Sequence, residues 1–264
     1  MKAWVFGLVF AFALAGSPVY ADVWDTSADN DDSAASTDTE LVHGSDQIHD
    51  LGFRPGPVPD QDWYKVWVPP YASFEIVFDG IGGDVNLWEP GTVQRLAGDG
   101  ITVVQDAQGV STGALSMRLA WRNTTNAPLL SFIRVISAAC ALTCTSADQY
   151  RIVARETTVF LARFNNAGSQ TTVLLSQNAS ALPVNATYHF WNASGTLLDT
   201  VTLNAAAPRT LTVTSAAGRP ALAGQSGHVT IAHDAQYGTW NVKAVALEPS
   251  TGFSFDTPGV IRPY

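Results

Sequence analysis

Few residues of this chain have a spacing that would support hydrolytic chemistry. Gly224-Gln225-Ser226-Gly227-His228 comes nearest to a serine nucleophile elbow, but the G-x-S-x-G pattern requires glycine where His228 stands. Glycine and serine at these positions more simply form a turn before a strand over 228–232. We therefore predict no catalytic site and expect a protein that is not an enzyme.

The histidines offer little for a zinc ion. His228 and His233 are five residues apart, and an odd separation on a strand places two side chains on opposite faces, so they should not share a metal. His43 and His49 have acidic neighbours and could form a site, but they are more simply polar surface residues. The zinc-protease pattern H-E-x-x-H does not occur.

Oxygen-bearing side chains early in the chain could bind calcium, which prefers six to eight oxygen ligands. The candidate ligands are Asp29, Asn30, Asp31, Asp32 and Asp62. Asp60 and Asp62 precede a predicted strand, where capping of a turn is the alternative role. Paired carboxylates for glycoside hydrolysis would also require a cleft, which this pattern does not predict.

An aromatic run forms the clearest candidate binding surface. If 63–68 is a strand, one face carries Tyr64, Val66 and Val68, and the other carries Trp63, Lys65 and Trp67. Because lysine rarely faces a core, we expect Trp63 and Trp67 on the outer face, where flat rings suit sugars or a partner protein. Packing against a second domain or a loop is the alternative. Trp191 and Trp240 are expected in a core or an interface.

The elements that must position these residues are predicted to be strands. Apolar and polar side chains alternate in 73–79, 149–156 and 197–203, and alternation is the period of a strand rather than a helix. The predicted buried faces carry Phe74, Ile76 and Phe78, then Tyr150, Ile152 and Ala154, then Leu197, Val201 and Leu203. Short strands between Gly, Pro, Asn and Asp clusters predict an all-β fold of two consecutive antiparallel β-sandwich (jelly-roll-like) domains. A single continuous barrel is the alternative.

Four segments are predicted along the chain: a signal peptide over 1–21, an acidic flexible leader over 22–40, a first sandwich over 41–156 and a second over 157–264. Strands over 131–137 and 149–155 would form an antiparallel pair. Their loop would carry a Cys140–Cys144 disulfide, the default for two cysteines in an oxidising compartment. The tail after Pro249 would be an extended segment.

Export is predicted from the first residues. Lys2 precedes an apolar run that is broken at 16–18, and Val19-Tyr20-Ala21 provides a cleavage site. The run is shorter than the ~20 residues of a membrane span, so we expect a secreted, periplasmic or cell-surface chain without membrane insertion after cleavage. The formal charge of −9 argues against nucleic acid as a partner.

Residues 29–156 contain a set of short motifs found together in one family. They are Asp29-Asn30-Asp31-Asp32-Ser33, Asp60-Gln61-Asp62-Trp63-Tyr64-Lys65-Val66, Phe132-Ile133-Arg134-Val135 and Tyr150-Arg151-Ile152-Val153. With these motifs the region resembles the bacterial pre-peptidase C-terminal (PPC) domain. The resemblance implies a non-catalytic, jelly-roll-like sandwich of exported proteins; some relatives bind collagen or other polymers, and some bind calcium through an acidic N-terminal linker. No family is recognised for 157–264.

These features together predict a secreted, non-enzymatic β-sandwich protein. It would act as a binding or structural module that recognises an extracellular polymer or a partner protein, with calcium as the one candidate ion. The alternative is an accessory or inhibitory subunit of a separate secreted hydrolase or peptidase.

Overall fold

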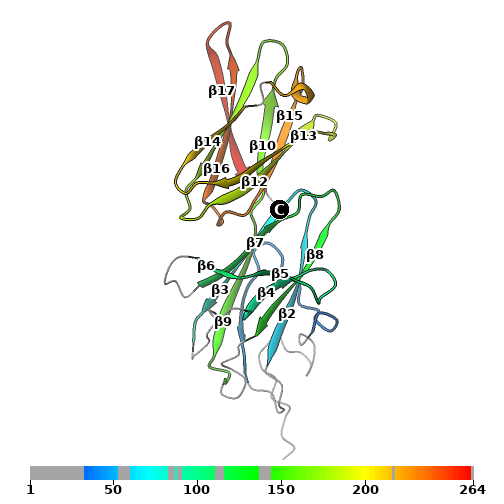
Figure 1. Cartoon of the computed structure of the whole chain (residues 1–264), viewed down its shortest axis with the longest axis vertical. Coiled ribbons are helices and arrows are strands. Elements are labelled where there is room, and N and C mark those ends of the chain that lie inside the picture. The colour runs from blue at the N-terminus through cyan, green and yellow to red at the C-terminus, as the bar shows by residue number, and fades with distance from the viewer. Residues whose placement is uncertain are drawn as a thin grey trace, which may run out of the picture.

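The computed structural model describes residues 33–52, 60–82, 87, 91–110, 116–136, 144–215 and 218–262. In these ranges the chain forms strands, turns and a short 3-10 turn, η2 (Pro220–Leu222), with no α-helix. No helix in this part of the chain is long and apolar enough to cross a membrane. The predicted all-β fold is confirmed, and Figure 1 shows it as two bodies, one above the other. The predicted signal peptide lies outside the described residues.

The first body consists of two antiparallel sheets. Its strands are β1 (Asp46–Asp50), β2 (Gln61–Val68), β3 (Ser73–Gly80), β4 (Val93–Leu96), β5 (Val103–Asp106), β6 (Gln108–Gly109), β7 (Ser116–Arg122), β8 (Leu129–Ile136) and β9 (Gln149–Glu156). One sheet has the order β1-β9-β3-β7-β6 and the other the order β2-β8-β4-β5. Most neighbours within a sheet are distant in sequence, so the chain crosses repeatedly between the two layers.

The alternation of side chains builds the core of this first sandwich. Successive residues of a strand point to opposite faces, and the buried set includes Phe74, Ile76 and Phe78 of β3 and Tyr150, Ile152 and Ala154 of β9. The buried faces predicted for these two runs are therefore confirmed.

The pairing predicted for β8 and β9 is wrong. β8 pairs with β2 and β4, whereas β9 pairs with β1 and β3 in the other sheet. Each strand buries one face against the opposite layer, so the two strands lie in different sheets rather than side by side in a hairpin. Cys144, which precedes β9, is buried. Cys140 lies outside the described residues, and the disulfide stays a prediction.

The second body is one antiparallel sheet folded into two layers. Its strands are β10 (Val159–Asn165), β11 (Thr171–Asn178), β12 (Val184–Asn192), β13 (Leu197–Ala206), β14 (Leu211–Ser215), β15 (Ser226–His233), β16 (Trp240–Glu248) and β17 (Phe253–Ile261). Their order is β13-β12-β15-β10-β17-β16-β11-β14. The domain boundary predicted near Glu156 falls in the short connection between β9 and β10.

Strand β17 joins the two layers of the second sandwich. Its residues up to Pro258 pair with β16, and Gly259 to Ile261 pair with β10. The crossing requires glycine, because a Cβ at Gly259 would lie 2.8 Å from both the Val159 side chain and the Val242 carbonyl oxygen. The segment after Pro249, predicted only as an extended tail, is therefore a central strand.

A bulge changes which leucine of β13 reaches the second core. Between the pairs Phe190–Asp199 and Trp191–Leu197 the register shifts by one residue. As a result Leu198 packs against the core together with Val201 and Leu203. The prediction of Leu197 at this place is wrong, because strict alternation takes no account of the inserted residue.

Hydrogen bonds from a buried ion pair of the first sandwich connect the two sandwiches. The loop after β15 lies against β3, β7 and β9: Arg118 donates to the Asp234 carbonyl oxygen at 2.5 Å, and the Tyr237 amide donates to Glu75 at 2.9 Å. Arg118 also pairs with Glu75, which is 1% exposed, and the Arg155 guanidinium lies 4.8 Å from the Tyr237 ring centroid. A buried charge is tolerated only when it is paired, so this contact favours one arrangement of the two bodies.

Candidate functional site

The tryptophan surface predicted on β2 is only half present. Tyr64 and Val66 belong to the core, and Trp67 on the other face is 48% exposed. Trp63, however, is only 6% exposed; it packs in a small outer cluster with Leu96 and Phe132. The expectation of two exposed rings flanking Lys65 is therefore wrong for Trp63.

The cover over Trp63 comes from the segment before β1. Thr37 donates its hydroxyl to the Trp63 carbonyl oxygen at 2.5 Å, and Leu41 donates its amide to the Lys65 carbonyl oxygen at 2.8 Å. Ala34 of the same segment packs against the outer cluster. The end of the predicted leader is thus docked along the edge of β2, and this contact takes Trp63 out of the solvent.

The predicted calcium ligands do not come together in the described residues. Asp29, Asn30, Asp31 and Asp32 lie outside them. Asp62 is 3% exposed and accepts a hydrogen bond from the Tyr150 hydroxyl, which lies 2.5 Å from the Tyr64 hydroxyl. Burial, followed by the charge of Asp62, raises the pKa of Tyr150 well above its usual value. No group of three or more His, Cys, Asp or Glu side chains suited to a metal occurs in the described part of the chain, and calcium stays a prediction.

His49 belongs to this same buried network, and its predicted place on the surface is wrong. It is 1% exposed, and its ring centroid lies 5.0 Å from that of Tyr64 and 5.7 Å from that of Tyr150. His43 instead accepts a hydrogen bond from the Glu156 amide at 3.0 Å. Side chains of β1 alternate between two faces, and His49 lies on the face toward the core, where aromatic neighbours replace water.

His228 and His233 lie on opposite faces of β15, as predicted. His228 stacks beside Trp191 at 6.2 Å on the outer face, while His233 lies 6.1 Å from Trp240 in the core. The glycine before His228 has a structural role, because a Cβ at Gly227 would lie 1.8 Å from the Trp191 carbonyl oxygen. The Gly-Gln-Ser-Gly segment is therefore a turn that leads into β15.

Trp191 also contacts the first sandwich, and Trp240 is buried, so both tryptophans occupy the places predicted for them. The Tyr71 ring centroid lies 4.9 Å from that of Trp191 and 4.8 Å from that of His189. The backbone of Tyr71 reaches this position with φ +56°, a value that residues other than glycine rarely adopt. The aromatic contact is thus part of the junction between the sandwiches.

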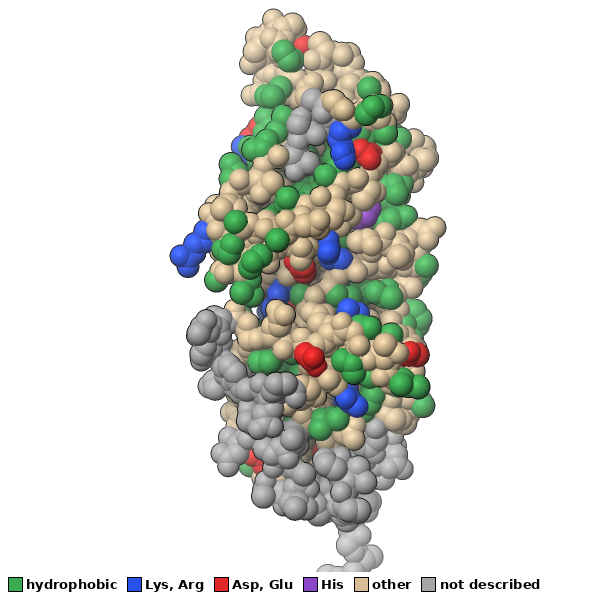
Figure 2. All heavy atoms as spheres, viewed as in Figure 1, with side chains coloured by type: hydrophobic (Ala, Val, Ile, Leu, Met, Phe, Trp, Pro, Cys, Tyr) green, Lys and Arg blue, Asp and Glu red, His purple; other side chains and the backbone are tan. Residues whose placement is uncertain are grey.

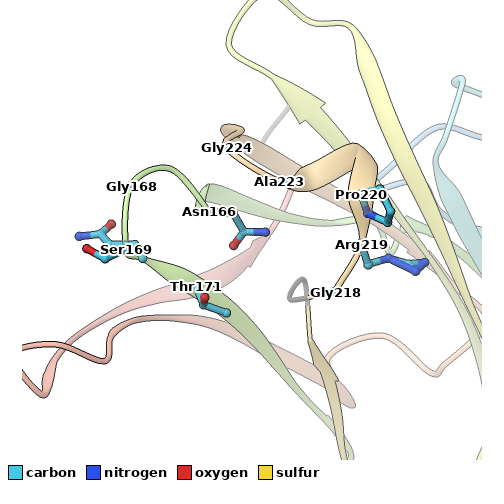
Figure 3. Close-up of a pocket in the computed structure, with 10 residues that line it drawn as sticks. Asn166, Gly168, Ser169, Thr171, Gly218, Arg219, Pro220, Ala223 and Gly224 are labelled. Carbon is cyan, nitrogen blue, oxygen red and sulfur yellow. The ribbon is translucent and has the colours of Figure 1, made fainter.

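An open pocket of about 480 Å³ lies between two loops of the second sandwich, and Figure 3 shows its lining. One loop is 166–171, between β10 and β11, and the other is 218–224, between β14 and β15. Backbone contacts hold the two loops together: the Asn166 amide donates to the Gln225 carbonyl oxygen at 2.8 Å, and the Gly224 amide donates to the Asn166 carbonyl oxygen at 3.1 Å. The walls of the pocket are therefore fixed relative to each other.

The lining of this loop-end pocket combines apolar surface with several uncharged polar side chains, and it has almost no free charge. Arg219 is the charged side chain among the lining residues, and its guanidinium pairs with Asp199 at 2.9 Å. Asn166 is anchored by its carboxamide oxygen, which accepts from the Thr172 amide at 2.8 Å. A hydrogen bond from Ser169 lowers the pKa of Glu248 on the neighbouring hairpin. The site can therefore offer amides, hydroxyls and backbone groups to a ligand.

A second exposed feature is the outer face of β14, β11 and β16. This aliphatic face carries Leu211, Val213, Val173, Leu175, Val245 and Leu247, and hydrophobic side chains gather on the left flank of the upper body in Figure 2, where Figure 1 places β14 and β16. Leu211 and Val213 are 61% and 59% exposed. β14 ends the strand order, so in the described residues it has a neighbouring strand on one side only. An edge of this kind can pair with another chain.

Sequence reasoning missed the loop-end pocket, because its residues are ordinary turn formers. Glycine, serine and asparagine between strands indicate loops, and about 50 residues separate the two segments that meet here.

Comparisons with known proteins add little. No protein family and no curated protein matches the chain. Among solved structures, the full extracellular region of zebrafish Gpr126/Adgrg6 is 11% identical, with a TM-score of 0.27 over 83% of this chain and 30% of that one. A β-glucuronidase from glycoside hydrolase family 2 is 11% identical, with a TM-score of 0.22 over 88% of this chain and 26% of that one. Likenesses this weak carry no argument about function, and the chain spans less than a third of either protein.

Proposed function

We propose that this chain is an exported, non-enzymatic β-sandwich protein that binds an extracellular polymer at the loop end of its second sandwich. The observation that carries the proposal is the open pocket between 166–171 and 218–224, with about 480 Å³ of space and walls that backbone hydrogen bonds hold in place. Loops at the end of a rigid sandwich are common binding sites, because the sheets hold them in place. Small-molecule sites have volumes of about 300–1,000 Å³.

The first sandwich would serve as a PPC-like support in this proposal, and the signal-like segment 1–21 would direct export. The buried Glu75–Arg118 pair supports a fixed spacing between the two bodies, which suits a module that presents one end to a polymer. Calcium binding by the acidic segment Asp29–Asp32 remains part of the proposal, and titration of the purified protein with calcium would test it.

The proposal is tested by binding to a panel of insoluble polymers. The mature chain is incubated with collagen fibrils and with several polysaccharides, and the bound fraction is measured after sedimentation. Retention on at least one polymer, saturable and competed by its soluble fragments, is expected. Retention on none of them at high protein concentration would refute binding to an extracellular polymer.

A partner protein is a second candidate, favoured by the aliphatic face of β14, β11 and β16. Soluble monomers rarely expose contiguous apolar patches of this kind. The test replaces the exposed Val213 of the edge strand β14 with lysine, with Asn241→Lys on the same face as the matched control. If an exported hydrolase associates here, Val213→Lys removes it from the co-purified fraction and Asn241→Lys does not. Equal association of both variants with the hydrolase contradicts this surface.

A further inference from the structure

The loop-end pocket has a composition that indicates one class of ligand. We propose that it binds a neutral sugar unit within a longer polysaccharide; this inference rests on the proposed function and makes its ligand specific. It follows from three properties of the site: its balance of charge, its hydrogen-bonding groups, and the aromatic side chains at the same end of the sandwich.

The charge of the site disfavours an ionic ligand. Arg219 is held by Asp199, with their nitrogen and oxygen 2.9 Å apart and both side chains partly buried. A carboxylate, sulfate or phosphate ligand would have to compete with Asp199 for this guanidinium, and a cation would find no unpaired carboxylate among the lining residues. A neutral ligand leaves the existing ion pair intact.

The hydrogen-bonding groups match a ligand with many hydroxyls. The polar lining side chains are Asn166, Ser169, Gln170 and Thr171. Amides and hydroxyls each both donate and accept, as sugar hydroxyls do. The Gln170 carboxamide oxygen already accepts from Asn165, and Ser169 already donates to Glu248, so the Gln170 amide group would donate to a sugar hydroxyl and the Ser169 hydroxyl would accept from one. In Figure 3 the Asn166 side chain extends into the space between the two loops, and Gly168, Gly218 and Gly224 leave backbone exposed on the walls.

Exposed phenylalanines lie at the same end of the sandwich. Phe253 pairs across the hairpin with Glu248, and the pocket residue Ser169 hydrogen-bonds to Glu248. Phe253 is 63% exposed and Phe255 is 51% exposed. An aromatic ring with an open face can pack against the C–H face of a sugar. A polysaccharide whose one unit occupies the pocket would therefore continue over the hairpin that carries these rings.

The shape of the site distinguishes a polymer from a free small molecule. The pocket is open between its two loops rather than enclosed, so a ligand in it keeps one side in solvent (Figure 3). Small molecules are usually held in clefts that bury most of their surface. A single sugar would bind weakly here, and contacts of neighbouring units along the hairpin would add to the affinity.

The experiment uses the mature chain with three kinds of probe: soluble neutral glucan, mannan and xylan, an acidic polygalacturonate, and collagen. Affinities are measured by calorimetry and by retardation in gels that contain each polymer. The blocking variant is Ser169→Trp, which adds a bulky ring at an exposed position of the lining, and Phe253→Ala removes one ring. The matched control is Ser146→Trp, the same substitution on an exposed turn of the first sandwich. Circular dichroism and thermal unfolding check that each variant folds.

Binding to at least one neutral polysaccharide is expected, weakened at least tenfold by Ser169→Trp and several-fold by Phe253→Ala, and unchanged by Ser146→Trp. Binding to polygalacturonate or collagen alone overturns the neutral-sugar inference but leaves the proposed function standing. Neutral-polysaccharide binding that Ser169→Trp does not weaken overturns the pocket as its site. Absence of binding to every probe overturns both this inference and the proposed function.

Discussion

Acid should destabilise the second sandwich through one buried histidine. His233 is 2% exposed, its Nδ1 accepts from the Ala235 amide at 3.2 Å, and its ring lies beside Trp240. Burial, aided by the charge of Arg118, lowers the pKa of His233 from 6.5 to about 3. The folded chain therefore keeps this imidazole neutral at pH values where the unfolded chain protonates it.

The direction of the effect follows from this difference in proton binding. Below pH 6.5 the unfolded state binds a proton that the folded state does not. The contribution of His233 to the free energy of unfolding is therefore fully present above pH 6.5 and is lost as the pH falls toward 3. Each pKa unit corresponds to about 1.36 kcal/mol, so His233 alone should remove about 2.7 kcal/mol at pH 4.5.

Two other buried groups also contribute to the pH dependence. Burial lowers the pKa of His189 to about 4, which acts in the same direction as His233. Burial raises the pKa of Glu156 above 4.5. The contribution of Glu156 to the free energy of unfolding is therefore present below pH 4.5 and lost as the pH rises through its folded pKa. Its pH dependence is opposite to that of the two histidines. Comparison of a single variant with the parent chain separates His233 from both.

The assay is urea unfolding followed by tryptophan fluorescence at several pH values from 5 to 7.5. In His233→Asn the new carboxamide oxygen can still accept from the Ala235 amide, but the side chain no longer titrates. The slope of the unfolding free energy between pH 5 and 6 should fall by about 1 kcal/mol per pH unit. His228→Asn on the same strand is the control. Its change in slope should be smaller, because His228 is only half-buried. An unchanged slope in His233→Asn would refute the reasoning.

Three further substitutions test other parts of the fold by urea unfolding. Tyr150→Phe removes a donor from the buried carboxylate of Asp62 and should cost about 1.5–3 kcal/mol; a midpoint equal to that of the parent contradicts this. Gly227→Ala places a Cβ against a carbonyl oxygen 1.8 Å away on β12 and should cost more than about 2 kcal/mol, and full stability would show that the two strands separate easily. Glu75→Gln leaves the charge of Arg118 unpaired and should cost about 3–5 kcal/mol at the junction; if the two sandwiches still unfold together at the parent midpoint, the pair does not couple them.

The alternation of residues predicted much of the fold but not the partners of its strands. Phe74, Ile76 and Phe78 could be assigned to one buried face because strand geometry is local. The placement of β8 and β9 in different sheets could not, because strand pairing depends on which distant segments complete each layer. The bulge that places Leu198 against the core could not be predicted either, because a single inserted residue cannot be recognised in the pattern of apolar and polar residues.

The candidate sites were harder to predict than the fold. Trp63 and Trp67 have the same parity in β2, yet only Trp67 is exposed, because a segment about 25 residues earlier covers Trp63. His49 is similar: its polar neighbours in sequence indicated a surface place, and two distant tyrosines enclose it. Burial is decided by what packs over a side chain, which is a property of the assembled layers.

By itself, the sequence determined the class of structure and the face of most strands, because the preference of apolar side chains for one side acts over a few neighbouring residues. Only the tertiary structure decided that loops 166–171 and 218–224 form one pocket, and that Glu75 and Arg118 meet at the junction of the two sandwiches. These contacts join residues that are far apart in the chain, and they exist only once the sheets have folded over each other.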